Sequence, residues 1–375
     1  TALQMTSLIC TLQDHRDDVN WCAFSGKLLA TCSGDKTLRI YNTCDFSELP
    51  FSPLSGHGYS VHCCCFSACG QFLASCSTDA TTVVWSMDSG EIEAVLEHPG
   101  RSPVRICALS PDSAHLVSGA SDGTLALWDF PTKQLRKTGA VSDTTMVACS
   151  FSPCSQVFMT GSTYGDLRLW NLDMNQLHAE KNAHDLGVTC CTFDPNILSG
   201  GQVVQFRLAS CGQDSLLKIW AINKLSSGAY KMQLLHTLTG QSAPVLSCAY
   251  SSDGQLLVSG SVDKTVTVYD AKNAVLLYTL NQHERTDIQA LQLPSPDHLA
   301  LTHPRRENLC GPIEAAGQRL VGGGCVSVAG GGRPRGIGGQ IHSQQHRRDG
   351  AAQSHQGNAG VRAAHSLMGI TRLVS

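Results

Sequence analysis

The chain has 375 residues, of which 15% are charged and 42% hydrophobic, and its formal net charge is -3. This balance is ordinary for a soluble globular protein and gives no electrostatic reason to expect nucleic acid or an anionic membrane as a partner. No apolar run approaches the roughly 20 residues of a membrane helix. The opening stretch TALQMTSLICTL lacks the charged region and apolar core of a secretory signal.

The 18 cysteines lie mostly in apolar, alternating stretches such as VHCCCFS (61–67) and VTCCTF (188–193). Successive side chains of a strand point to opposite faces, so the adjacent Cys63 and Cys64 cannot converge. The repeats described below contain no paired C-x-x-C spacing of the kind that marks a metal site. We therefore expect reduced, buried cysteines, no disulfides and no metal, in a cytoplasmic or nuclear and not a secreted protein.

One short pattern recurs six times, in chain order as TCSGDKTLRIYN (31–42), SCSTDATTVVWS (75–86), SGASDGTLALWD (118–129), TGSTYGDLRLWN (160–171), SCGQDSLLKIWA (210–221) and SGSVDKTVTVYD (259–270). The terminal aromatics of successive copies are 42 to 50 residues apart. A period of this length, with several short strands in each unit, is typical of propeller blades.

Each unit has the same predicted organisation. In the second repeat an outer strand precedes Gly56, and three strands follow in SVHCCCFS, FLASCS and TTVVWS. Alternation with a period of two, bounded by glycine, serine and aspartate, predicts strands throughout and no long helix. After an N-terminal extension (1–7), the propeller is predicted over residues 8–283, with repeats at about 8–42, 50–86, 92–129, 134–171, 177–221 and 234–270. A longer loop is expected between Asp194 and Phe206.

These features resemble the WD-repeat family. An aspartate stands six residues before the terminal aromatic in five copies, and a histidine opens four; they are Asp35, Asp79, Asp122, Asp214 and Asp263, with His15, His57, His98 and His184. The resemblance implies that both join a serine or threonine and the strand-end aromatic in one network. Those aromatics are Tyr41, Trp85, Trp128, Trp170, Trp220 and Tyr269. A buried turn carboxylate needs such donors. Repeat four, with Tyr164, and repeat six, with Gln241, should be looser.

The same residues do not predict an enzyme. One aspartate and one histidine per blade have the wrong geometry for an active site, where unlike groups converge on one substrate. The sequence shows no phosphate-binding loop, paired carboxylates or nucleophile elbow. We therefore expect no catalytic residue, cofactor, metal or small-molecule substrate, and proteins as partners. Loops of a rigid propeller usually carry binding, and the candidate anchors there are Trp21, Tyr59 and Arg105.

The C-terminal tail, residues 284–375, departs from the repeats. A seventh repeat begins at NQHERTDIQA with His283, but no Asp-to-aromatic copy follows, and LICTL (8–12) is expected to be the outer strand of this incomplete last blade. Rich in glycine, proline, arginine and histidine, the tail is expected to be disordered, because it cannot bury enough apolar surface to offset ordering. Back-translated and read one nucleotide later, residues 319–359 permit a string that resembles a SAM domain. We hypothesise that the tail is out-of-frame translation.

Six repeats followed by a SAM-like string resemble the family of WD-repeat, SAM and U-box domain-containing proteins, as do HDLGVTCCTF and FRLASCGQDSLLKIW. The resemblance implies a propeller that selects substrates, a SAM domain that self-associates, and a U-box that recruits a ubiquitin-conjugating enzyme. The expected function is therefore a protein-interaction scaffold that lacks the SAM and U-box domains. The alternatives are a ubiquitin-protein transferase, the activity of the full-length family, or a non-functional truncated product whose open ring exposes a sheet edge.

Overall fold

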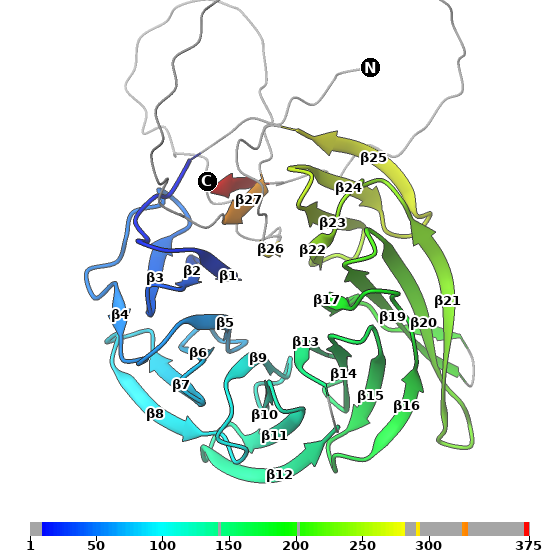
Figure 1. Ribbon diagram of the computed structural model, residues 1–375, viewed down its shortest axis with the longest axis horizontal. Helices are drawn as coiled ribbons and strands as arrows, with labels where there is room; N and C mark the ends of the chain where they lie inside the picture. Colours follow the sequence, from blue (N-terminus) through cyan, green and yellow to red (C-terminus); the bar gives the residue numbers. More distant parts are fainter. Residues whose placement is uncertain are drawn as a thin grey trace, which may run out of the picture.

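The computed structural model describes residues 10–141, 144–200, 203–281, 290–292, 325–328 and 371–374. Six sheets stand around a central axis, each with its first strand at the axis and its last at the periphery (Figure 1). The predicted all-β propeller is therefore confirmed, and the described residues contain strands and no helix. No described segment forms a helix that is long and apolar enough to cross a membrane.

The blades follow one another along the chain, and their strands run from the axis outward. Blades one to three comprise β1 (Val19–Ser25), β2 (Leu28–Ser33), β3 (Thr37–Asn42), β4 (Leu54–Ser55); β5 (Val61–Phe66), β6 (Phe72–Ser77), β7 (Thr81–Ser86), β8 (Ile92–Glu97); and β9 (Val104–Leu109), β10 (His115–Ala120), β11 (Thr124–Asp129), β12 (Gln134–Ala140).

The second half of the ring has the same plan. Blades four to six comprise β13 (Met146–Phe151), β14 (Val157–Ser162), β15 (Leu167–Asn171), β16 (Gln176–Glu180); β17 (Val188–Phe193), β18 (Leu198–Gly200), β19 (Val203–Gly212), β20 (Leu217–Lys224), β21 (Tyr230–Leu238); and β22 (Val245–Tyr250), β23 (Leu256–Ser261), β24 (Val266–Asp270), β25 (Val275–Leu280).

The core lies between neighbouring blades. Middle strands such as β6 and β7 are buried on both faces, whereas the outer strand β12 is largely exposed. One apolar cluster joins Val84 of blade two, Leu116 of blade three and Phe158 of blade four. Burying each such side chain contributes about 1.5–3 kcal/mol, so adjacent blades stabilise one another through their facing side chains.

Blade five differs from the loop expected between Asp194 and Phe206. Part of this segment forms β18, which pairs with the beginning of β19, so the insertion extends the sheet as a hairpin. The long partners β20 and β21 continue the same extension. The prediction of a plain loop was wrong because the Val203–Val204–Gln205 stretch pairs on both sides, with β18 and with Asn223–Lys224 of β20.

A small sheet from the C-terminal part of the chain lies beside β1. Residues 10–12 of the predicted outer strand LICTL are not in a strand, and residues 8–9, the extension 1–7 and His283 lie outside the described residues. Three short strands, β26 (Ala290–Gln292), β27 (Cys325–Val328) and β28 (Thr371–Val374), form a small sheet. Its strand β26 contacts both β1 and β22 and so stands where the ring would otherwise open (Figure 1). The rest of the tail, predicted to be disordered, lies outside the described residues.

Candidate functional site

Blades two and five each contain an unbroken chain of hydrogen bonds from a tryptophan to an aspartate. In blade five, Trp220 Nε1 donates to Ser210 Oγ over 2.8 Å. The Ser210 hydroxyl donates to His184 Nε2 over 2.8 Å, and His184 Nδ1 donates to Asp214 over 2.9 Å. The equivalent bonds of blade two have the same lengths and join Trp85, Ser75, His57 and Asp79. In this tautomer both ring nitrogens of each histidine have a hydrogen-bond partner.

Blades one and three depart from this arrangement, although their sequences match it. His15 contacts Asp35 over 2.9 Å and Thr31 over 2.8 Å, but the Tyr41 hydroxyl donates to Asp14. In blade three, Trp128 donates to Ser118 over 3.0 Å, whereas His98 Nε2 is buried without a hydrogen-bond partner. His98 Nδ1 accepts from the Gly100 amide over 3.3 Å. It therefore presents a lone pair, and not a proton, on the side where Asp122 was expected.

Blades four and six use substitutes. Trp170 donates to Thr160 over 2.9 Å, and the exposed Tyr164 takes no part in the network. In blade six, the buried Gln241 accepts from the Ser259 hydroxyl over 2.7 Å and donates to the Thr265 carbonyl over 3.0 Å. Gln241 therefore occupies the place of the histidine. The looser packing expected of these two blades stays a prediction.

The network aspartate of blade two is held in its charged form. Burial alone would raise the pKa of Asp79, but hydrogen bonds from His57 and Thr81 hold it well below its usual range. Burial lowers the pKa of His184 in blade five, against the opposing effect of Asp214. Each network joins residues of one repeat only, so these side chains fasten a turn to a strand.

A second set of side chains comes together at one mouth of the central channel. In every inner strand the second residue is skipped in the pairing register and forms a β-bulge; these residues are Asn20, His62, Arg105, Val147, Thr189 and Leu246. A bulge redirects the side chain of the extra residue. All six line one cavity of about 340 Å³, together with Trp21, Ile106, Thr163, Val188 and Gln213. We call this cavity the channel mouth.

Contacts between blades fix several of these side chains. Asn20 Nδ2 donates to the Val61 carbonyl of the next blade over 2.7 Å. Arg105 donates through a guanidinium nitrogen to His62 Nε2 over 3.2 Å. Burial, together with the charge of Arg105, lowers the pKa of His62 to about 4, so the imidazole is neutral at physiological pH. Arg105 is then the one residue of the channel-mouth lining that carries a full charge.

Of the three residues expected at the binding rim, the structure places two in the channel-mouth lining and one outside it. Trp21 and Arg105 both line the channel mouth. Tyr59 does not line it; its side chain is 61% exposed, and the Lys36 ammonium lies 5.6 Å from its ring centroid. The sequence identified only Arg105 among the six bulge residues and missed the other five, which are Asn20, His62, Val147, Thr189 and Leu246. All six bulge residues share one position, directly after the first residue of the inner strand. That first residue is valine in five blades and Met146 in the fourth.

Comparisons with known proteins agree with this architecture. The family model of the WD domain, G-beta repeat (WD40) matches residues 6–42, 49–86, 90–129, 133–171, 175–221 and 232–270. The chain is 77% identical to WD repeat, SAM and U-box domain-containing protein 1 of Danio rerio over 282 residues, which are 75% of this chain and 58% of that protein.

The proteins of the same name from other vertebrates are also similar. That of Homo sapiens is 54% identical over 276 residues, and that of Gallus gallus is 53% identical over 276 residues; each match covers 73% of this chain and 58% of the relative. The chain thus spans little more than half the length of these relatives. With six matched repeats and six complete blades, the chain belongs to the WD-repeat family.

Proposed function

We propose that this chain is a protein-interaction module that binds its partner at the channel mouth. The observation that carries the proposal is the bulge in each inner strand, which brings six unlike side chains, one from each blade, around a single cavity. The turn networks recur with similar residues in most blades, whereas the bulge residues differ from blade to blade. Variable side chains on a rigid frame are typical of a recognition surface.

The lining suggests the chemistry of the partner. Arg105 supplies the positive charge, Asn20 and Thr189 supply polar groups, and Trp21 and Leu246 supply apolar surface. Arginine recognises carboxylates through paired hydrogen bonds. The partner segment that fits best is an extended peptide that carries an acidic residue beside an apolar one.

The proposal is tested by selecting acidic peptides against the purified full chain and measuring their affinities. Arg105→Glu should weaken the selected peptides at least about tenfold, or about 1.4 kcal/mol, because a like charge then faces the carboxylate. Arg136→Glu, on the exposed outer strand β12 of the same blade, makes the same charge change and should leave affinity within about twofold. Equal weakening by both variants would indicate a general charge effect and would contradict binding at the mouth.

We further propose that the propeller serves as the substrate-recognition part of a U-box ubiquitin-ligase-like protein of the cytoplasm or nucleus. The names of the similar vertebrate proteins, which include SAM and U-box domains, support this proposal. Ubiquitin transfer itself, the alternative, is assayed by incubating the full chain with activating and conjugating enzymes, ubiquitin and ATP. We expect no autoubiquitination, and ubiquitin chains that depend on this protein would favour the enzyme.

A further inference from the structure

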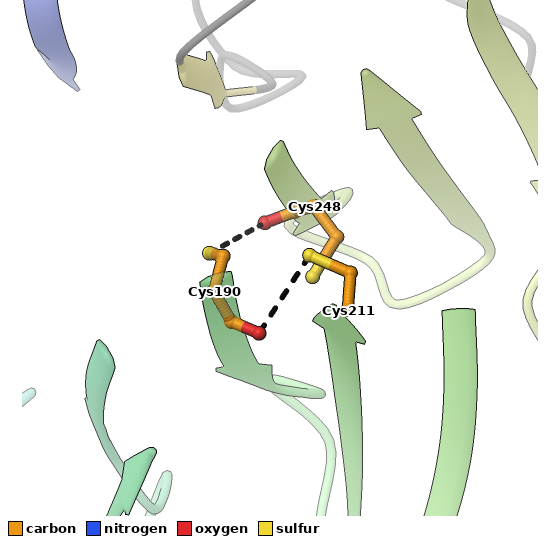
Figure 2. A group of neighbouring side chains, drawn as sticks. All are labelled: Cys190, Cys211 and Cys248. Atoms are coloured by element: carbon orange, nitrogen blue, oxygen red, sulfur yellow. Dashed lines mark hydrogen bonds between the residues drawn. The ribbon is translucent and has the colours of Figure 1, made fainter. Parts of the chain in front are cut away.

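Three cysteines converge in the wall between blades five and six, close to the axis. The sulfur atoms of Cys190, Cys211 and Cys248 all lie within 4.8 Å of one another, and all three residues are buried (Figure 2). The spacing of cysteines along the chain predicted no metal site. That prediction considered neighbours in sequence, whereas this cluster is assembled from three strands of two blades.

The pairing of strands and the packing of blades bring these three cysteines together. Cys190 of β17 and Cys211 of β19 are direct partners in the antiparallel register, so their side chains share one face of blade five. Cys248 projects toward them from β22, the inner strand of blade six (Figure 2). Main-chain contacts hold the sulfur atoms in place, since Cys211 Sγ lies 3.7 Å from the Cys190 carbonyl and Cys190 Sγ 3.8 Å from the Cys248 carbonyl.

We propose that Cys190, Cys211 and Cys248 form a binding site for a thiophilic metal ion, Cu(I). The cluster offers three sulfur ligands and contains neither imidazole nor carboxylate. With metal–sulfur bonds of about 2.3 Å, a trigonal ion holds its ligands about 4 Å apart, and the sulfur atoms reach this spacing by moving less than about 1 Å. Soft thiolates select Cu(I) among first-row ions, and a structural Zn²⁺ site would need a fourth ligand.

The surroundings support a metal site in two ways. A cavity of about 210 Å³, lined by Cys190, Cys248, Cys107 and neighbouring inner-strand residues, lies beside the cluster and gives the ion a path along the channel. The Thr189 hydroxyl donates to the Val245 carbonyl of blade six, and its oxygen lies 3.4 Å from Cys211 Sγ. When a metal ion displaces the thiol proton of Cys211, this hydroxyl is close enough to turn toward the thiolate, and hydrogen bonds of this kind orient a metal ligand. On binding, Cu⁺ displaces the protons of the thiols that it coordinates, and these protons leave through the cavity.

Blades two and three provide a matched comparison. Cys63 and Cys76 are register partners, as Cys190 and Cys211 are, and Cys107 occupies the place of Cys248 in the following blade. Within the part of the chain that the structure describes, only the cluster of blades five and six brings its three sulfur atoms within 4.8 Å of one another. We therefore expect one tightly bound ion per chain.

The test titrates the reduced full chain, without oxygen, with Cu(I) supplied as its bicinchoninate complex. We expect one equivalent to transfer and the X-ray absorption spectrum to show three sulfur ligands at about 2.3 Å. Cys248→Ala should weaken this transfer at least about 100-fold, since even the loss of a side chain that only hydrogen-bonds to a ligand weakens metal binding roughly 10–100-fold. Cys107→Ala, at the equivalent buried position, should change it less than about threefold.

Other outcomes would overturn the assignment. Equal loss in both variants, no transfer, or transfer that disappears when the exposed Cys44 and Cys69 are alkylated would show that the cluster does not hold the ion. Displacement of Cu(I) by equimolar Zn²⁺ would contradict the choice of ion. If Cys248→Ala does not keep the wild-type circular dichroism spectrum, Cys211→Ser takes its place and must show the same loss.

Discussion

The two buried histidines His184 and His98 look alike in sequence, but the structure predicts opposite responses to substitution. Each opens a repeat and is followed at a distance by an aspartate, a serine and a tryptophan. His184 uses both ring nitrogens, toward Asp214 and Ser210. His98 leaves its buried Nε2 unpaired. Replacing each histidine with leucine, which has a similar volume, therefore removes a fully satisfied network in blade five. In blade three it removes an unsatisfied Nε2 and one long hydrogen bond from the Gly100 amide to Nδ1.

The magnitude follows from the bonds that are lost. His184→Leu removes a hydrogen bond to a buried carboxylate, about 1.5–3 kcal/mol, and leaves the Ser210 hydroxyl without its acceptor, about 1 kcal/mol more. We expect the free energy of unfolding to fall by about 3 kcal/mol, because Asp214 keeps its contacts with the Asp185 and Leu216 amides. For His98→Leu we expect a smaller loss, about 1 kcal/mol, because exchanging the unpaired Nε2 for an apolar group is nearly neutral and only the long bond from the Gly100 amide to Nδ1 is lost.

Urea unfolding followed by circular dichroism measures both variants against the parent chain. A shift of the midpoint at constant slope reports stability alone. Equal destabilisation by the two substitutions, or a larger effect of His98→Leu, would refute the argument that hydrogen-bond satisfaction, and not mere burial of an imidazole, stabilises a blade.

Two further predictions concern pH and backbone conformation. Stability should decrease from pH 7 to pH 5, because burial lowers the pKa of His184 and the unfolded chain, with a histidine pKa of about 6.5, binds protons first. It should fall again below about pH 4, because protonation of Asp79 opposes the hydrogen bonds that hold its pKa low. Urea midpoints at pH 7, 5 and 3 check both steps, and His184→Leu should reduce the first step without abolishing it, since His62 contributes in the same direction. Gly123→Ala should destabilise by about 3 kcal/mol or more, because the new Cβ would lie 2.0 Å from the Val141 carbonyl oxygen. Gly228→Ala has nearly the same positive φ but no atom within 4 Å, and thermal melts should show only the roughly 1–2 kcal/mol of a left-handed alanine.

The sequence predicted the blades well because their determinants are local. The alternation along each strand and the six-residue interval from Asp79 to Trp85 both involve residues close together in the sequence. Packing between neighbouring blades buries the same positions in every repeat. Sequence could not distinguish His98 from His184, since the difference depends on which group contacts the Nδ1 atom. In blade five that group is the carboxylate of Asp214. In blade three it is the Gly100 amide.

The channel mouth was predicted only in part for a related reason. Trp21 and Arg105 were identified because tryptophan and arginine are common in binding surfaces. Asn20 and Thr189 are not unusual residue types, and only their position in the repeat distinguishes them. Their role depends on a bulge, which is a property of pairing between two strands. The cluster at Cys190 depends on packing between two blades, so no spacing within one repeat reveals it.

The claim that the channel mouth is the protein-binding surface is tested most directly by site-specific photocrosslinking in cells. A photoreactive amino acid is placed at Val147 or Leu246, which line the mouth from different blades, and at the exposed Leu135 of the outer strand β12. We predict that Val147 and Leu246 capture the same protein and that Leu135 does not. Capture of that protein from Leu135 alone would place the partner on the periphery and contradict the account.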